Sequence, residues 1–219
     1  MYQYLLFDLD GTLTDSQEGI TKSVDYALRT VAGIQTADLS TLTAYIGPPL
    51  IDGFMENHHL DDKTAAQCKK IYRSRYETIG LYENRVYAGI PEALSRLRAA
   101  GFTLAVATSK PEPLAKRILV HFGLDGYFTE ICGATLDGRI SQKEDVIAEV
   151  LRRLGHPAAQ TVLMIGDRRH DVQGAKTHGL NCLGALWGFG TKTELQTAGA
   201  ALLASTPEAM TALLCRGQS

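Results

Sequence analysis

Two carboxylates stand where the first buried strand of the chain should end. The apolar run 4–7 is followed by Asp8 and Asp10, one residue apart, and then by Gly11 and Thr12. Carboxylates at the end of a buried strand are costly to leave unpaired, so they usually hold a cation or do chemistry. Asp8 could attack phosphorus and form an acyl-phosphate, while Asp10 could protonate the leaving oxygen and later deprotonate water. The alternative for this segment alone is a strand followed by an ordinary Asp-Gly turn.

A second pair of carboxylates, Asp167 and Asp171, lies four residues apart after the apolar run 161–165. One helical turn separates them, so both can face the same point. Oxygen ligands in this number suit Mg²⁺, which keeps several waters and binds through one or two carboxylates plus phosphate. The alternative is a helix cap followed by a solvated acid of the first turn. We expect His170, which lies between the two acids, to point to solvent.

Thr108 follows another apolar run, 103–107, and is the candidate phosphate-binding hydroxyl. Its hydroxyl could donate to a phosphate oxygen, helped by the backbone N–H of Ser109 at a helix start. The alternative for Thr108 taken alone is a helix N-cap. A transferred phosphoryl group also needs a cation to balance its charge. Two lysines compete for this role: Lys110, whose side chain could as easily point to solvent, and Lys143, which opens a later helix.

Most of the chain alternates apolar strands with single amphipathic helices. Strands are predicted at 4–7, 103–107, 129–133, 161–165 and 182–186. Short strands separated by single helices imply parallel pairing, and therefore an α/β fold with a doubly wound parallel sheet. Ligands of such a sheet bind beyond the carboxyl ends of its strands. The acids and the threonine described above should therefore converge on one edge.

Residues 15–87 break this rhythm, because they show helical patterns but no convincing strand. Besides an apolar stripe at its start, this stretch has helical patterns at 50–57 and 61–79. We therefore expect an α/β core domain made of residues 1–14 and 88–219, with residues 15–87 inserted as an α-helical domain. A helical domain inserted next to a catalytic strand end is well placed to act as a lid.

The composition argues against several classes of partner. Lysine and arginine number 22 against 24 acidic residues, which does not fit a general nucleic-acid binder. No apolar stretch approaches the roughly 20 residues that a membrane span needs, and the start of the chain does not resemble a signal peptide. The four cysteines form no CxxC pair and should be reduced. We expect a cytoplasmic protein that is a monomer or a weak homodimer, with no membrane or nucleic-acid partner.

Together, the motifs resemble the four motifs of the haloacid-dehalogenase superfamily. The resemblance is carried by Asp8-Leu9-Asp10-Gly11-Thr12, Thr108, a later lysine and Gly166-Asp167-x-x-x-Asp171. The insertion after the first motif resembles the helical C1 cap of that superfamily. Five short segments also resemble its phosphoglycolate-phosphatase-like branch: 7–16, 45–50, 107–112, 166–172 and 186–190. The motifs are far more specific for the superfamily than for a substrate.

The resemblance implies a Mg²⁺-dependent phosphomonoester hydrolase that acts on a small phosphorylated metabolite through an aspartyl-phosphate. It makes Asp8 the nucleophile and Asp10 the general acid and base. It also makes Asp171 a supporting acid near the metal or the lysine. The implied phosphate contacts are Asp8, Leu9, Asp10, Thr108, Ser109 and Lys143. The implied Mg²⁺ ligands are the Asp8 carboxylate, the Asp10 backbone carbonyl and Asp167.

One departure concerns the lysine motif. Many relatives place this lysine in Lys-Pro-x-Pro, whereas Lys143 is followed by Glu144 and Asp145 without a proline. The order of the motifs nevertheless favours Lys143 over Lys110, because Lys143 lies between the threonine and the second pair of acids. The resemblance further implies the order 3-2-1-4-5 for the five predicted strands.

Several alternative functions stay open. A 5'-nucleotidase or a pyrophosphatase would have the same fold. A mutase resembling β-phosphoglucomutase is disfavoured, because 17–23 lacks the histidine that those relatives carry early in the cap. A dehalogenase would not need Asp10, Asp167 and Asp171 together. An alternative from another class of protein is a non-catalytic phosphate-binding module.

The candidates for substrate contacts in the cap are Glu18, Lys22, Gly47 and Arg75. Of these, Arg75 is more simply explained as part of a solvated helix face.

Overall fold

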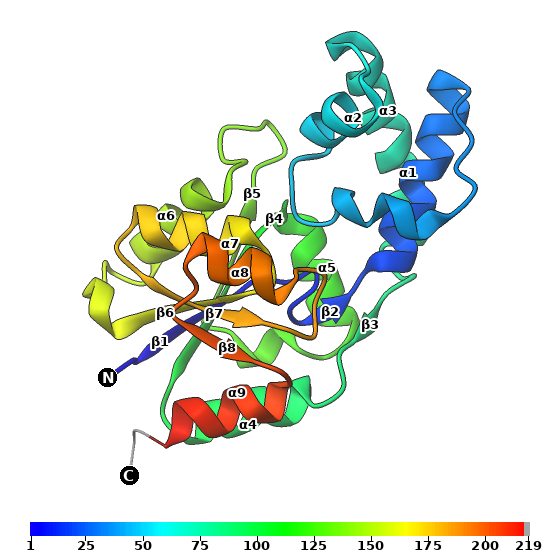
Figure 1. The fold of residues 1–219 in the computed structure, drawn as a ribbon. Coiled ribbons are helices and arrows are strands. Elements are labelled where there is room, and N and C mark those ends of the chain that lie inside the picture. Colours follow the sequence, from blue (N-terminus) through cyan, green and yellow to red (C-terminus); the bar gives the residue numbers. More distant parts are fainter. Residues whose placement is uncertain (217–219) are drawn as a thin grey trace. The chain divides into compact units, whose positions relative to one another are not determined.

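The computed structural model describes residues 1–216, which form two compact units (Figure 1). One unit consists of Met1–Thr14 together with the chain from Val86 onward, and the other is Asp15–Arg85. Both crossings of the chain between the units fall in short strands, β2 (Thr14–Asp15) and β3 (Arg85–Val86), which form a two-stranded sheet. The second boundary lies two residues before the one that we expected from the sequence.

The first unit contains a six-stranded parallel sheet in the order β5-β4-β1-β6-β7-β8. The strands are β1 (Tyr4–Phe7), β4 (Thr103–Pro111), β5 (Glu130–Ala134), β6 (Val162–Gly166), β7 (Asn181–Ala185) and β8 (Leu202–Ala204). The prediction of a doubly wound parallel α/β sheet is confirmed, and its five strands have the order 3-2-1-4-5. The edge strand β8 was not predicted, because two half-buried residues and one buried residue are too few to carry a readable pattern.

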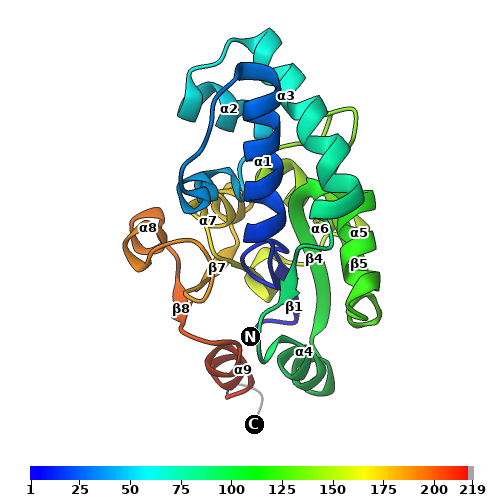
Figure 2. The same cartoon turned by 90° about the vertical axis from the view of Figure 1, so that its right-hand side faces the viewer.

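Helices cover both faces of this sheet (Figures 1 and 2). Helices α6, α7 and α8 pack on one face, where Leu6, Ala105 and Met164 from the central strands are fully buried. Helices α4, α5 and α9 lie on the other face, and α4 contacts α9. The bounds are α4 (Ile90–Ala99), α5 (Glu112–His121), α6 (Lys143–Arg153), α7 (Arg169–Thr177), α8 (Lys192–Ala198) and α9 (Pro207–Cys215). Burial on both faces explains why the central strands are uniformly apolar.

The second unit is helical. It contains α1 (Gln17–Ala32), the 3-10 helix η1 (Leu39–Tyr45), α2 (Leu50–His58), α3 (Asp62–Arg75) and the π-helical segment η2 (Tyr76–Gly80). Helices α1 and α3 pack together, and α1 makes a close approach to η2, because a Cβ on Gly19 would lie 1.9 Å from the Gly80 carbonyl oxygen. The helix predicted at 61–79 is therefore divided into α3 and η2. Within residues 1–216, no helix has the length and apolar character that crossing a membrane requires.

All four cysteines of the chain are free in the structure: Cys68, Cys132, Cys182 and Cys215. Cys132 on β5 and Cys182 on β7 are four strand spacings apart, about 19 Å at about 4.8 Å per spacing. A disulfide requires Cα atoms within about 7 Å. We therefore expect a thiol reagent to label four cysteines per chain in denaturant without a reductant. Mass spectrometry that found two fewer labels would contradict this arrangement.

Candidate active site

The two acids of the first motif leave β1 in a tight turn. The backbone N–H of Asp8 donates to the Ile165 carbonyl at 2.9 Å, which holds the end of β1 against β6. Gly11 then adopts φ 85°, which favours glycine. A Cβ on Gly11 would lie 2.3 Å from a carboxylate oxygen of Asp167, so the turn also depends on the missing side chain. The sequence Asp-x-Asp-Gly thus allows the first motif to lie directly against the later acids.

Asp8, Asp167 and Asp171 form a buried cluster of carboxylates. One oxygen atom of each lies within 4.8 Å of the others. They come from the end of β1, the turn after β6 and the first turn of α7, and are 4%, 0% and 1% exposed. Three carboxylates this close and this buried repel one another, so they require a cation or a proton. Their hard oxygen atoms fit Mg²⁺. The fully buried Leu9 could contact a phosphate only through its backbone.

Lys143, the first residue of α6, supplies a positive charge to this cluster. Its Nζ lies 2.9 Å from Asp8 Oδ1 and 2.8 Å from Asp171 Oδ1, and it donates to the Ala107 carbonyl at 3.1 Å. Burial alone would lower the pKa of Lys143, but the charges of Asp171 and Asp8 outweigh it and raise this pKa. Asp171 is therefore not the solvated acid of the alternative interpretation. It is buried and paired with Lys143.

Burial also raises the pKa values of the two later acids. For Asp167, burial and then the charges of Asp171 and Asp8 raise the pKa well above its ordinary value. Hydrogen bonds from Phe189 and Thr12 only partly oppose this rise. For Asp171, burial raises the pKa to about 6, against the opposing charge of Lys143. Protons and a metal ion therefore compete for these carboxylates, and metal affinity should rise with pH.

The segment after β7 fixes the position of Asp167, a role that our sequence analysis missed. The backbone N–H of Phe189 donates to Asp167 Oδ2 at 2.8 Å, and Thr12 Oγ1 donates to Asp167 Oδ1 at 3.1 Å. Trp187 Nε1 donates to the Thr12 carbonyl at 2.9 Å. A Cβ on Gly188 would lie 2.4 Å from Asp167 Cβ, so only glycine fits there. The alternation of glycine and aromatic residues after a strand was the available signal.

Thr108 is buried near the end of β4, two residues beyond the register pair of Phe7 and Val106. This register brings it beside the turn that follows β1. The Lys110 backbone N–H donates to Thr108 Oγ1 at 3.3 Å. Ser109, the other predicted phosphate contact on β4, is only half-buried.

The structure decides the burial of two further side chains near these acids, and for His170 our expectation of a solvent-facing side chain was wrong. Lys110 does not point to solvent: it is 8% exposed, and its Nζ lies 2.9 Å from Asp10 Oδ2. His170 is half-buried instead of solvated, and its Nε2 is buried without a hydrogen-bond partner among residues 1–216. In both cases packing of the surrounding elements, which the local pattern does not reveal, sets the burial. Asp8 and Asp10 are thus paired with different lysines.

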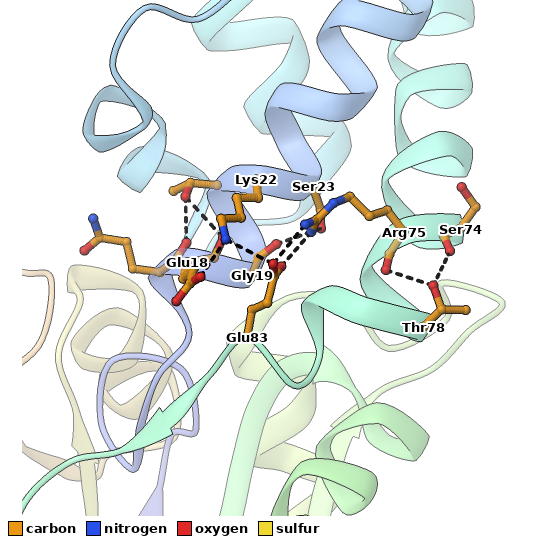
Figure 3. Close-up of polar contacts among 10 residues, drawn as sticks. Glu18, Gly19, Lys22, Ser23, Ser74, Arg75, Thr78 and Glu83 are labelled. Atoms are coloured by element: carbon orange, nitrogen blue, oxygen red, sulfur yellow. Dashed lines mark hydrogen bonds and ion pairs between the residues drawn. The ribbon is translucent and has the colours of Figure 1, made fainter.

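In the helical unit, three of the four candidate residues meet in one ion-pair network around Glu83 (Figure 3). Lys22 Nζ lies 2.5 Å from Glu18 Oε1 and 3.1 Å from Glu83 Oε1. Arg75 donates to both Glu83 carboxylate oxygens, at 2.8 and 3.0 Å, and to Ser23 Oγ at 3.0 Å. The interpretation of Arg75 as a solvated face was therefore wrong, since its side chain is 18% exposed.

The fourth candidate, Gly47, lies in the turn between η1 and α2 with φ 108°. A cleft of about 390 Å³ opens in the helical unit, and Glu18 and Glu83 form part of its lining. The remaining lining residues are Asp15, Gln17, Thr21, Leu39, Asn84 and Arg85. The cleft thus contains residues of the ion-pair network but not Gly47.

Comparisons with known proteins found a matching family model and several similar proteins. A family model described as haloacid dehalogenase-like hydrolase matches residues 5–185. A 5'-nucleotidase of Pseudomonas aeruginosa is 48% identical over 195 residues, which are 89% of this chain and 87% of that protein. Tyrosine-protein kinase PtkA of Mycobacterium tuberculosis is 42% identical over 189 residues, 86% of this chain but 63% of that longer protein. The crystal structure of a predicted phosphatase from Clostridium acetobutylicum superposes with a TM-score of 0.95 at 45% identity, covering 99% of both chains.

The carboxylate cluster predicts that Mg²⁺ stabilises the folded protein. At a hundred times its Kd, an ion that binds only the folded state adds about 2.7 kcal/mol, or about 5–10 °C in Tm for a chain of this size. Thermal unfolding with Mg²⁺ or with a chelator measures this rise. In Asp167→Asn, which removes one carboxylate of the cluster, most of the rise should be lost. The control Glu208→Gln changes an exposed acid and should respond like the wild type; an equal rise in all three proteins would contradict the site.

Proposed function

Because the haloacid dehalogenase-like hydrolase model covers residues 5–185, the chain belongs to that family, and we propose that it is a Mg²⁺-dependent phosphomonoester hydrolase acting through an aspartyl-phosphate. The observation that carries the proposal is the buried cluster of Asp8, Asp167 and Asp171, in which Lys143 pairs with Asp8 and Asp171. Carboxylates suit a divalent cation, and an ammonium suits the oxygens of a phosphate. The 5'-nucleotidase and the predicted phosphatase among the relatives support a phosphate ester as the substrate.

In the first half of the proposed reaction, a carboxylate oxygen of Asp8 attacks phosphorus and the bond from phosphorus to the leaving oxygen breaks. Asp10 gives its proton to that oxygen as the bond breaks. Lys143 and the Thr108 hydroxyl, with the backbone N–H of Ser109, bind the non-reacting phosphate oxygens. These donors are preorganised, since both Lys143 and Thr108 are buried and held by other residues.

In the second half, water attacks phosphorus and the bond between phosphorus and Asp8 breaks. The Asp10 carboxylate takes the proton of that water, which restores the starting state. A Mg²⁺ ion bound by the Asp8 carboxylate, the Asp10 backbone carbonyl and Asp167 would neutralise charge on the phosphate. We assign Asp171 to Lys143, because this acid lies 2.8 Å from the ammonium and keeps it next to the nucleophile.

The substrate that we infer is a small phosphorylated metabolite, and nucleoside 5'-monophosphates are the first candidates, because the relative at 48% identity is named a 5'-nucleotidase. Phosphoglycolate is the second candidate, from the resemblance of the motifs. We propose that the helical unit is the cap and contributes specificity through Glu18, Lys22, Gly47 and Arg75. Lys22, whose side chain is 38% exposed, is more available to a ligand than Arg75. The cytoplasmic location and the monomer or weak homodimer remain predictions.

A phosphate-release assay tests the proposed function. The purified protein should hydrolyse at least one of nucleoside monophosphates, phosphoglycolate, sugar phosphates and pyrophosphate with Mg²⁺, and a chelator should stop it. Asp8→Asn should lower turnover by at least about a thousandfold, because an amide is a far poorer nucleophile and metal ligand. Circular dichroism should show an unchanged fold. Residual hydrolysis within about tenfold of the wild type would remove Asp8 from this role, and no release from any ester would indicate a phosphate-binding module.

Lys143→Ala should lower kcat/KM by at least about a hundredfold, because the transition state loses one preorganised charge worth about 2.7 kcal/mol. Steady-state kinetics at saturating Mg²⁺ measures the loss at a temperature where the variant is folded. The matched control is Lys116→Ala, which removes an exposed lysine on α5 and should leave kcat/KM unchanged. A small loss in Lys143→Ala would show that another residue neutralises the phosphate.

A further inference from the structure

Lys110 lies at an irregularity of the sheet, in the strand β4. The parallel register between β4 and β5 shifts after Thr108, so that two extra residues of β4 precede Pro111. On the neighbouring strand, a Cβ on Gly133 would lie 2.5 Å from the Lys110 carbonyl oxygen. The bulge therefore needs a glycine beside it. Bulges are common next to active sites, where they redirect a side chain.

The Lys110 side chain forms a buried ion pair with Asp10. Lys110 Nζ lies 2.9 Å from Asp10 Oδ2, and the two side chains are 5% and 10% exposed. A buried charge is costly unless it is paired, so each partner holds the other in place. The second oxygen, Asp10 Oδ1, is also buried but has no hydrogen-bond partner among the residues that the structure describes. The pair thus distinguishes the two oxygens of one carboxylate.

We propose that Lys110 is a positioning residue for proton transfer, which it serves by fixing Asp10 so that Oδ1 carries the transferred proton. This inference rests on the proposed function, in which Asp10 protonates the leaving oxygen and then takes a proton from water. Lys143 contacts the nucleophile and Asp171, whereas Lys110 contacts the acid and base. The two lysines therefore have separate roles: loss of Lys143 should affect every phosphate ester, whereas loss of Lys110 should affect mainly esters whose leaving oxygen must be protonated.

Esters with different leaving groups distinguish this role, because they differ in how much they need a proton donor. An alkyl alkoxide must be protonated as it leaves, whereas an activated nitrophenolate can leave without a proton. General acid catalysis contributes about a hundredfold to ten-thousandfold where it is needed. Lys110→Met should therefore lower kcat/KM for an alkyl phosphate by at least about thirtyfold more than for p-nitrophenyl phosphate. Lys110→Arg, which keeps the charge, should recover most of that difference.

Two further variants control the measurement. Lys116→Met, at an exposed lysine of α5 that also pairs with a carboxylate, should change neither substrate. Asp10→Asn should show the same selective loss for the alkyl ester, and adding Lys110→Met to it should cost less than about threefold more, because both act through one step. The double variant also removes both partners of the buried pair, so it stays informative if Lys110→Met alone fails to fold.

The outcomes separate this inference from the proposed function. A wild-type protein that hydrolyses neither ester with Mg²⁺ would reject the proposed function. If the wild type is active but Lys110→Met loses both esters equally, or loses neither, Lys110 does not position the proton donor. Full additivity of Asp10→Asn and Lys110→Met would overturn the inference in the same way.

Discussion

The cost of burying several carboxylates at one point governs the structure of this protein. Asp8, Asp167 and Asp171 come from three separate elements and are almost fully removed from water. Such a cluster is stable only with protons, with a cation or with a lysine between the acids. Lys143 provides part of the compensation, and the raised pKa values of Asp167 and Asp171 show that it is incomplete. The remaining demand for positive charge is what makes the cluster a candidate metal centre.

Close approaches of the backbone bring these charges together. Gly11 and Gly188 each lie against Asp167, at positions where any Cβ would clash. Gly133 leaves room for the Lys110 carbonyl at the bulge of β4, and Gly174 lets α7 approach the Lys143 side chain. At all four glycines the missing side chain leaves room for a residue of the site. The rigid sheet beneath them then fixes the distances between charges that come from distant parts of the chain.

The helical unit uses charge in a different way. Lys22 and Arg75 are compensated within the unit, because Glu83 accepts from both of them (Figure 3). The network joins α1, the end of α3 and the segment before β3, so it stabilises the ends of the unit where the chain enters and leaves it. Any substrate anion that binds these cations must compete with Glu83. An anionic group would therefore gain less binding free energy from Lys22 and Arg75 than two unpaired cations would provide.

Periodicity and strand-end motifs were enough to predict the parallel sheet, the inserted helices and the residues of the buried cluster. These features are readable because each depends on local spacing, such as Asp8 after an apolar strand. The sequence could not decide which lysine pairs with which acid. Lys110 and Lys143 differ little in their local patterns, and only the bulge of β4 and the packing of α6 direct them to Asp10 and to Asp8. The support of Asp167 by the segment 187–190 and the pairing of Arg75 were equally hidden. Such contacts join residues far apart in the chain, and their energies depend on burial, which tertiary packing alone decides.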